Sequence, residues 1–291
     1  MARPRSGALS SASSDLPLET LRGEDWIAIV HAPWRKALTE AGWLARAPLE
    51  KRTPAASLGV EPRKHAGRGD VYRVSLEPGP ALLRPVRHGG WLAPLLGPRL
   101  AGPGRPFAEL RATASLWALG APVPEPVMAL AWRSGGPLWR ALVATRELPD
   151  TLDGHAFLSI HPSRAAVHAA LVAAGGALRH FHDTGGRHRD LNLGNLLLKV
   201  ADPPDTSATR VWVIDLDGAR VGAPPSPRRR LGELMRLYRS LRKRGGGDCA
   251  RLAAGLFRSY CAGDRALRAH MLRWRRLEEM RVAVHALRYP S

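Results

Sequence analysis

The spacing of hydrophobic and polar residues differs between the two halves of the chain. In the first half, apolar or alternating runs of four to eight residues are typical of strands. In the second half, apolar residues recur every three or four positions, as they do on the buried face of a helix. The expected strands are residues 71–74, 81–84 and 138–145, and the expected helices are residues 163–184, 231–243, 249–261 and 266–286. Strands followed by helices predict an α+β fold with a small β-rich N-lobe and a larger helical C-lobe.

One helix is expected among the strands of the N-lobe. From Phe107 to Leu119, apolar or small residues recur at helical spacing, and the proline-rich stretch 121–127 cannot continue a helix. This stretch is expected to be an extended link that leads into the next strand.

The first 60 residues follow neither pattern for long. The stretch up to Pro17 is rich in Ser, Ala, Arg and Pro, and prolines from Pro48 to Pro62 interrupt the chain again. Between them lie an apolar run at 26–30 and one or two amphipathic turns at 34–43. We therefore predict a partly disordered N-terminal extension over residues 1–60, an N-lobe over 61–148 and a C-lobe over 149–291.

Composition adds a strong positive charge to this picture. The chain has 44 basic and 25 acidic residues, which gives a formal net charge of +19, and most of the basic residues are arginine. Such a field attracts polyanions, among them nucleic acids, anionic lipid head groups and phosphorylated glycolipids. The two cysteines, Cys249 and Cys261, lack metal-ligand spacing and suit a reducing compartment. No run of 18 apolar residues predicts a membrane-spanning helix, and the N-terminus lacks the apolar core of a secretory signal, so we expect a cytoplasmic protein.

The most specific motif lies between the predicted helix 163–184 and the next apolar run. Residues 188–195 read H-R-D-L-N-L-G-N and fit the pattern H-R-D-L-x-x-x-N of protein-kinase catalytic loops. In this pattern Asp190 accepts the proton of the acceptor hydroxyl and Asn195 binds Mg²⁺. Asp215 ends an apolar run 25 residues after Asp190, where a second metal-binding carboxylate is expected. The sequence therefore predicts phosphoryl transfer from ATP with Mg²⁺ in a protein-kinase-like fold.

Three upstream features fit a nucleotide site, and each has a simpler alternative. Gly67 and Gly69 precede an alternating run, as in a glycine-rich hairpin over ATP phosphates, although such glycines also occur in ordinary turns. Arg84 stands where a kinase strand carries Lys; it can contact phosphates or a carboxylate, or lie in solvent. Glu109 falls in the first turn of its helix, where it can pair with Arg84 or only complement the helix dipole. We favour the nucleotide site and the Arg84–Glu109 pair because the motifs occur in the order of a kinase.

Two further residues near these motifs have open roles. We expect His188 to brace the loop by hydrogen bonds and to take no part in the chemistry. Asp217 can assist metal binding or cap the turn that follows, and the sequence does not separate the two.

Several segments resemble the 3-deoxy-D-manno-octulosonic acid (Kdo) kinases, bacterial lipopolysaccharide-core enzymes related to protein kinases. The similar segments are residues 82–90, 107–110, 119–126, 190–198, 214–217 and 236–243. Asn192, where protein kinases usually carry Lys, agrees with the D-L-N form of that family. Two residues depart from the family pattern: Leu216 replaces the usual Phe, and Arg189 replaces a residue that is often small.

The resemblance implies ATP-dependent phosphorylation of a Kdo hydroxyl on Kdo–lipid A, at the cytoplasmic face of the bacterial inner membrane. It also implies that Arg84 is the family's own choice of cation. The basic clusters Arg228–Arg230 and Arg273, Arg275 and Arg276 can then dock on the anionic membrane surface, or can simply be solvated.

Three other functions compete with this interpretation. A kinase of the same fold can act on another core sugar, a small molecule or a protein hydroxyl. A pseudokinase would explain the absent strand Lys, but it disagrees with the intact Asp190, Asn195 and Asp215. No nucleic acid is expected as a partner, because neither a reading element nor an aromatic stacking platform is found.

Overall fold

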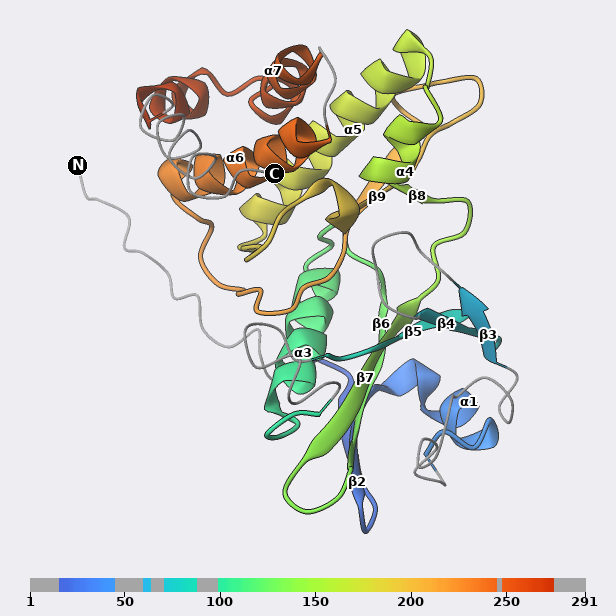
Figure 1. Ribbon diagram of the computed structural model, residues 1–291. Helices are drawn as coiled ribbons and strands as arrows, with labels where there is room; N and C mark the ends of the chain where they lie inside the picture. Colours follow the sequence, from blue (N-terminus) through green and yellow to red (C-terminus); the bar gives the residue numbers. More distant parts are fainter. Residues whose placement is uncertain (1–15, 45–59, 64–70, 88–98, 245–247, 275–291) are drawn as a thin grey trace, which may run out of the picture.

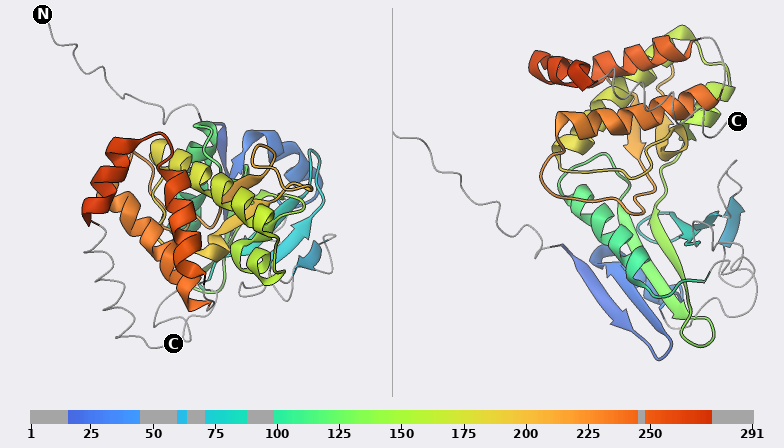
Figure 2. Two further views of the ribbon diagram at one scale, coloured as in Figure 1. Left: turned by 90° about the horizontal axis from the view of Figure 1, so that it is seen from above. Right: turned by 60° about the vertical axis from the view of Figure 1, so that its left-hand side comes forward.

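The computed structural model describes residues 16–44, 60–63, 71–87, 99–244 and 248–274, with the backbone alone for 60–63. These residues form two lobes stacked end to end, as Figures 1 and 2 show. The N-lobe is mostly sheet, and the C-lobe is mostly helical. This arrangement confirms the predicted α+β fold with a β-rich N-lobe and a helical C-lobe.

The N-lobe is built on a seven-stranded antiparallel sheet with the order β1-β2-β6-β7-β5-β4-β3. Its strands are β1 (Leu18–Arg22), β2 (Trp26–His31), β3 (Val60–Arg63), β4 (Val71–Val74), β5 (Ala81–Pro85), β6 (Pro126–Arg133) and β7 (Trp139–Arg146). β6 is buried along almost its whole length because it lies near the middle of this sheet and has a layer on each face.

Helices cover both faces of this sheet. α3 (Gly104–Ala118) packs on one face through Phe107 and Leu110, which meet alanines and valines of β6 and β7. The short helices η1 (Ala32–Trp34) and α1 (Arg35–Glu40) cover the other face, where Trp34 and Leu38 are buried. β5, which carries Arg84, buries Ala81 and Leu83 on the side of the sheet that α1 covers. Arg84 therefore points to the opposite face, which α3 covers.

The boundary expected at residue 60 does not coincide with the edge of the N-lobe. β1 and β2 belong to the seven-stranded sheet, and β2 pairs with β6 from Trp26 opposite Trp132 to Val30 opposite Met128. The predicted extension therefore supplies two strands of the lobe. Sequence analysis marked the apolar run at 26–30, but the partner strand lies 100 residues later and gives no local signal.

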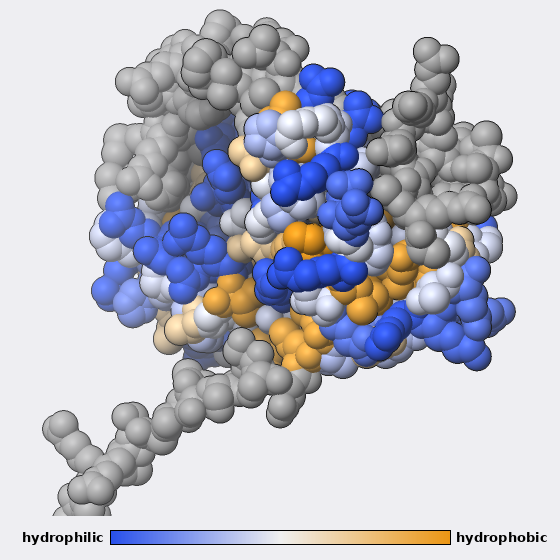
Figure 3. All heavy atoms as spheres, turned by 90° about the horizontal axis from the view of Figure 1, so that it is seen from below, coloured by the Kyte–Doolittle hydropathy of each residue, from blue (hydrophilic) through white to orange (hydrophobic). Residues whose placement is uncertain are grey.

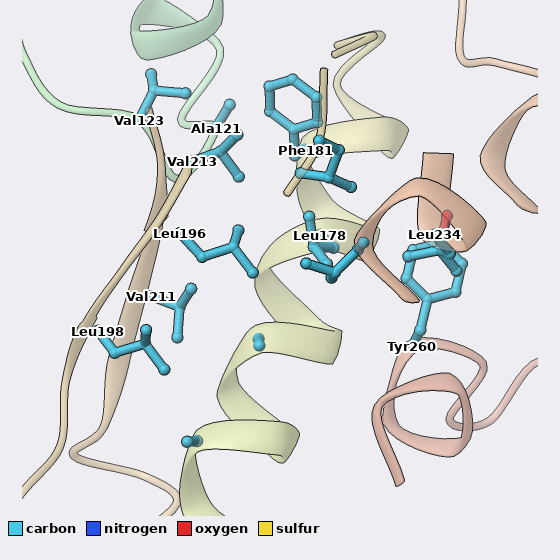
Figure 4. Packing of buried hydrophobic residues seen from close by; sticks show 14 of the residues in the cluster. Ala121, Val123, Leu178, Phe181, Leu196, Leu198, Val211, Val213, Leu234 and Tyr260 are labelled. Carbon is cyan, nitrogen blue, oxygen red and sulfur yellow. The ribbon is translucent and has the colours of Figure 1, made fainter. Parts of the chain in front are cut away.

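The C-lobe is arranged around α5 (Arg164–Asp183). A three-stranded sheet of β8 (Leu152–Asp153), β9 (Leu196–Lys199) and β10 (Arg210–Val213) packs on one side of it. α4 (Gly154–Ser159), α6 (Pro227–Lys243) and α7 (Cys249–Tyr260) complete the lobe. Figure 4 shows Leu178 and Phe181 of α5 between the strands and the residues Leu234 and Tyr260.

The predicted helices of the C-lobe are present, with different ends. Ser163 caps α5 as expected, since its Oγ accepts the Ala166 N–H at 3.1 Å. α6 begins at Pro227, four residues before the predicted start, because proline is tolerated in the first helical turn. Residues 265–274 are helical, and the rest of the predicted helix 266–286 lies outside the described residues.

Apolar side chains line a cavity in the C-lobe and also form part of the outer surface. A cavity of about 730 Å³ lies among α4, α5, α6 and α7, and its lining is largely apolar. At the N-lobe end, hydrophilic residues surround smaller hydrophobic areas (Figure 3). None of the helices that the structure describes has the length and apolar character needed to cross a bilayer.

Candidate active site

The predicted catalytic loop connects α5 to β9, on the side of the C-lobe that faces the N-lobe. It starts after Gly185, whose positive φ of 87° allows the chain to turn sharply at the end of α5. The next residue but one, Arg187, forms an isolated antiparallel bridge with Arg220, which lies just beyond the metal motif. The loop and the segment after β10 are therefore held side by side.

His188 has both ring nitrogens occupied by backbone groups. Its Nδ1 accepts the N–H of Asp190 at 3.1 Å, and its Nε2 lies 3.0 Å from the carbonyl oxygen of Ile214. Because a carbonyl can only accept, Nε2 carries the hydrogen. The imidazole is buried and joins the catalytic loop to the strand that leads to Asp215. This geometry supports the bracing role expected for His188.

Asp190 is exposed at the surface of the loop, and two amides hold its backbone. Asn195 Nδ2 donates to the Asp190 carbonyl at 2.9 Å, and Asn192 Nδ2 donates to the same carbonyl at 3.0 Å. Asn192 Nδ2 also lies 3.3 Å from Oδ2 of the Asp190 carboxylate. The two amides thus fix the backbone of Asp190, while its carboxylate remains accessible from solvent.

Asp215 follows β10 in a left-handed backbone conformation. Its φ is +59°, which is uncommon outside glycine and tolerated by Asp. The preceding residue, Ile214, donates its N–H to the Asn195 carbonyl at 3.0 Å, so the two predicted metal ligands come from adjacent segments. Such backbone outliers cluster at functional sites.

Three predicted residues from different elements meet beside this turn. Arg84 Nη2 of β5 donates to Glu109 Oε1 of α3 at 2.5 Å and lies 3.2 Å from Asp215 Oδ1. The expected Arg84–Glu109 pair is therefore confirmed, and the alternative of a solvated Arg84 is wrong. The expected place of Glu109 in the first turn is also wrong, because α3 begins at Gly104 and Glu109 falls in its second turn. Because Arg84 also contacts Asp215 of the C-lobe, its guanidinium connects β5, α3 and the predicted metal carboxylate.

Burial shapes the charges of this cluster. Desolvation raises the pKa of the buried Glu109 carboxyl, and the Arg84 guanidinium offsets part of this effect. Desolvation acts against the charge of Arg84, but Glu109 and then Asp215 outweigh it and raise the pKa of Arg84. Glu109 Oε2 is buried and has no hydrogen-bond partner among the described residues. The cluster thus keeps an unsatisfied acceptor next to a cation that is held in place.

Asp217 pairs with a residue that the sequence analysis did not mark. Both of its carboxylate oxygens accept from Arg105 in the first turn of α3, with Nε to Oδ1 at 2.8 Å and Nη2 to Oδ2. The helix dipole disfavours a cation at this end of a helix, and α3 has no acid in its first turn. An arginine at this position was therefore the available signal for an acidic partner.

Glu233 of α6 is a second residue that sequence analysis missed. Its Oε2 accepts the His188 N–H at 2.8 Å and lies 3.2 Å from His182 Nε2. His182 Nδ1 is in turn 2.6 Å from the Tyr260 hydroxyl. Because all of these groups are buried, α6 supports the catalytic loop through a polar network inside the lobe. No local pattern distinguishes Glu233 from other helical acids.

The predicted glycines Gly67 and Gly69 lie outside the described residues. The strands on either side of them, β3 and β4, pair antiparallel with Arg63 opposite Val71. Their role at nucleotide phosphates stays a prediction.

The side-chain oxygens of Asn195 and Asp215 suit Mg²⁺. Asn195 and Asp215 offer hard oxygen ligands, and Mg²⁺ usually takes one or two protein carboxylates with nucleotide phosphates completing its shell. No cluster of three or more His, Cys, Asp and Glu side chains that would suit another metal occurs among the described residues. The donor chemistry therefore fits a nucleotide-bound Mg²⁺ at the Asp215 turn.

Comparisons with known proteins identify the family of the chain. Residues 97–255 match the family described as "Lipopolysaccharide kinase (Kdo/WaaP) family". The chain is 32% identical over 221 residues to the 3-deoxy-D-manno-octulosonic acid kinase of Xylella fastidiosa (strain M12), which covers 75% of this chain and 81% of that protein. It is 32% identical over 209 residues to the kinase of the same name from Xanthomonas oryzae pv. oryzae (strain PXO99A), which covers 69% of this chain and 79% of that protein.

A solved structure described as "WaaP in complex with acyl carrier protein" is 21% identical with a TM-score of 0.49, and it covers 76% of this chain and 88% of that chain. The family match spans more than half of the chain, and the relatives above 30% identity span more than two thirds of it. The chain belongs to the lipopolysaccharide kinase (Kdo/WaaP) family and is a phosphotransferase with an alcohol group as acceptor.

Proposed function

We propose that this protein transfers the γ-phosphoryl group of ATP to a hydroxyl of the Kdo sugar on Kdo–lipid A. The observation that carries the proposal is the junction of Arg84, Glu109 and Asp215, which lies beside the loop of Asp190. A kinase site needs a cation for the phosphates, a metal carboxylate and a base for the acceptor, and this junction supplies the first two next to the third. The same residues disfavour a pseudokinase.

Each residue has a defined task in this proposal. Asp190 orients the acceptor hydroxyl from the open side of the loop and accepts its proton as the phosphoryl group is transferred. Arg84, held by Glu109, bears on the nucleotide phosphates and neutralises charge that develops there. Asn192 fixes the carboxylate of Asp190 through its amide. His188 keeps the loop and the Asp215 turn in register.

The cofactors would bind between these groups. Asn195 and Asp215 would hold Mg²⁺, and Gly67 and Gly69 would let backbone N–H groups approach the phosphates. Bound Mg²⁺ supplies positive charge that offsets the charge of the transferring phosphoryl group.

The choice of acceptor is supported by the relatives. The proteins from Xylella and Xanthomonas are named 3-deoxy-D-manno-octulosonic acid kinases, and the D-L-N form of the loop agrees with that family. Asn192 replaces the Lys that serves protein kinases, which favours a sugar hydroxyl over a protein hydroxyl.

Mass spectrometry of the acceptor tests this proposal directly. Purified protein incubated with ATP, Mg²⁺ and Kdo–lipid A should yield a product one phosphate heavier. Asp190→Asn should abolish product formation while the fold is retained, because Asp190 is exposed; the exposed loop residue Asp205→Asn is the matched control and should behave like the unchanged protein. Transfer to another core sugar, a small molecule or a protein, and none to Kdo–lipid A, would favour a different acceptor. Full activity of Asp190→Asn would reject the assigned base.

The lipid-linked acceptor would place the protein at the cytoplasmic face of the inner membrane. Arg228 and Arg229 are exposed and can face anionic lipid, while Arg230 is buried against Asp183 at 2.5 Å and is excluded from such a surface. Arg273 is also exposed, and Arg275 and Arg276 lie outside the described residues. Each exposed arginine near an anionic bilayer contributes about 1 kcal/mol.

Co-sedimentation with vesicles tests the membrane surface. Replacing Arg228 and Arg229 with Gln should weaken binding to vesicles that contain an anionic lipid, and 0.5 M salt should weaken it further, because screening shortens the reach of these charges. Arg111→Gln, an exposed arginine of α3 in the other lobe, is the control. Unchanged binding of the Arg228/Arg229 variant would reject these residues as the docking surface.

A further inference from the structure

A second ion pair connects α3 to the segment that carries the predicted metal carboxylate. Arg105 donates from Nε and Nη2 to the two carboxylate oxygens of Asp217, and its Nη1 also donates to the Arg87 carbonyl at 3.2 Å. The guanidinium therefore spans three points: the first turn of α3, the end of β5 and the segment after β10. These points belong to both lobes.

The geometry of this pair is that of a strong interaction. Two parallel N–H···O bonds between a guanidinium and a carboxylate fix the relative orientation of the groups as well as their distance. The Asp217 side chain is partly buried, with an exposed fraction of 24%, while Arg105 is more exposed at 41%. The pair is thus more than a solvated surface contact.

The pair runs beside the Arg84–Glu109–Asp215 cluster. Arg105 and Glu109 are four residues apart and lie on one face of α3, while Asp215 and Asp217 are two residues apart on the segment opposite. One link joins Glu109 to Asp215 through Arg84, and the other joins Arg105 directly to Asp217. Two links between the same two elements fix the rotation of α3 as well as its distance.

The pair also bears on which acid binds metal. Both Asp217 oxygens accept from Arg105, whereas Asp215 has one oxygen near Arg84 at 3.2 Å and a left-handed backbone that turns it out of the strand. A carboxylate that is engaged on both oxygens by a guanidinium has little capacity left for a cation. The contacts therefore distinguish Asp215, which can still offer an oxygen to a metal ion, from Asp217, which has both oxygens bound to Arg105.

We propose that Arg105 is a positioning residue that sets Asp215 against Glu109 and Arg84 by holding Asp217, and that Asp217 serves as this anchor and is not a metal ligand. The inference rests on the proposed function, because it assigns a task within the same nucleotide site. It concerns the nucleotide and the metal only, and it does not depend on which acceptor is used.

The experiment is a double-mutant cycle of Arg105→Gln and Asp217→Asn, read by ATP binding across a Mg²⁺ titration. A fluorescent ATP analogue reports binding without any acceptor, so failure of this inference is distinguishable from a wrong acceptor. Phosphoryl transfer gives kcat and KM for ATP separately. Each single variant should lower kcat/KM for ATP by about 10- to 100-fold, because small misplacements of reacting groups have effects of this size.

The double variant should be no worse than either single variant, since both remove the same link. The two single variants should show the same Mg²⁺ dependence as each other. Arg105→Lys should fall between the unchanged protein and Arg105→Gln, because Lys keeps the charge and loses the bidentate fork. Arg111→Gln on the exposed side of α3 should match the unchanged protein. Circular dichroism and thermal unfolding identify any variant that fails to fold, and Arg105→Lys then carries the comparison.

Two outcomes would overturn the inference. A raised Mg²⁺ requirement in Asp217→Asn, with Arg105→Gln unaffected, would make Asp217 a metal ligand. Additive losses in the double variant would mean that the two residues act separately.

Discussion

Arg84 touches two carboxylates that belong to different lobes. The contact with Glu109 is short and buried, and the contact with Asp215 is longer and more exposed. Glu109 therefore fixes the guanidinium, and Asp215 shares it. In the proposed function, Arg84 would contact nucleotide phosphates while Glu109 keeps it bound to α3.

Loss of this partner should impair catalysis more than stability. Glu109→Gln removes the charge that holds Arg84, so kcat/KM for ATP should fall about 100-fold or more, a loss typical of a disrupted electrostatic contact at a reacting group. Steady-state release of ADP measures it. Arg35→Met breaks the exposed Arg35–Glu19 pair of the same lobe and should leave kcat/KM unchanged. Equal effects of the two variants would contradict a specific role for Glu109.

At this scale the sequence predicts part of the site. Motif spacing predicted the pairing of Arg84 with Glu109, because protein kinases carry a cation on the corresponding strand and an acid on the helix that follows it. It did not predict Arg105 or Glu233, since their partners lie 112 and 45 residues away in the chain. The arginine in the first turn of α3 was a signal for an acidic partner, but the sequence does not tell which acid that partner is.

α5 contains two adjacent glycines with opposite surroundings. A Cβ on Gly175 would lie 2.5 Å from Ser259 Cβ and 2.7 Å from Tyr260 N of α7, whereas a Cβ on Gly176 would meet nothing within 4 Å. Gly175 therefore lets α5 and α7 approach closely. Gly176 is exposed and only adds conformational freedom to the unfolded chain.

Alanine substitutions at these two positions should have opposite effects on stability. Gly176→Ala should stabilise the protein by about 0.5–1 kcal/mol, since alanine is the better helix former. Gly175→Ala should destabilise it by about 1–3 kcal/mol, because backbone of α7 must move. Urea unfolding of both variants measures the difference. Stabilisation by both would mean that α5 and α7 are not in close contact.

The junction of α5 with α6 should make the C-lobe sensitive to acid. Arg230 and Arg179 donate to Asp183 and lower the pKa of its carboxyl below the ordinary 3.8, although burial opposes this effect. The folded state thus binds this proton more weakly than the unfolded state. The stabilising contribution is present above about pH 4 and is lost as the pH falls through the lowered pKa.

Asp183→Asn tests this contribution. The variant should be less stable than the unchanged protein at pH 7, and the difference in the free energy of unfolding should shrink below pH 4 as the native carboxyl is protonated. Urea unfolding at pH 7 and pH 3 provides the comparison, and the exposed Asp202→Asn is the control. A difference that is constant across this range would mean that the charge of Asp183 contributes nothing.

Helices and strands can be predicted from local sequence when only one of their faces is buried. The helices α3, α5 and α6 were predicted because each has one buried stripe at helical spacing. β6 was missed, and the strand expected after the proline-rich link was 138–145, because a strand buried on both faces has no alternation. Helix ends such as Pro227 were misplaced because caps depend on a few residues.

The two lobes meet through several segments. Leu116, Ala121 and Val123, at the end of α3 and in the link after it, pack into the core of the C-lobe, and the Val213 N–H donates to the Pro122 carbonyl at 2.7 Å. The chain crosses at residues 147–151, and α3 reaches the segment 215–217 through the two ion-pair links. The division at residue 60 that the sequence suggested does not match this assembly, since β1 and β2 lie within the N-lobe sheet. Pairing over 100 residues cannot be read from local composition.

Shortened chains test where the N-lobe begins. A chain that starts at residue 16 keeps β1 and β2 and should unfold at the same temperature as the full chain. A chain that starts at residue 33 loses both strands and leaves β6 as an edge with unpaired backbone groups, so it should be insoluble or strongly destabilised. Thermal unfolding and the soluble yield measure this. Equal stability of all three chains would restore residues 1–60 as a separate extension.

The pairing of β2 with β6 has a consequence for synthesis of the protein. The hairpin of β1 and β2 leaves the ribosome before its partner strand β6, which begins only at Pro126. At 5–20 residues per second, roughly 5 to 20 seconds of translation separate the two strands. During that interval the edge of β2 that later pairs with β6 is open to any other nascent strand. The hairpin therefore needs protection by chaperones until the middle of the chain arrives.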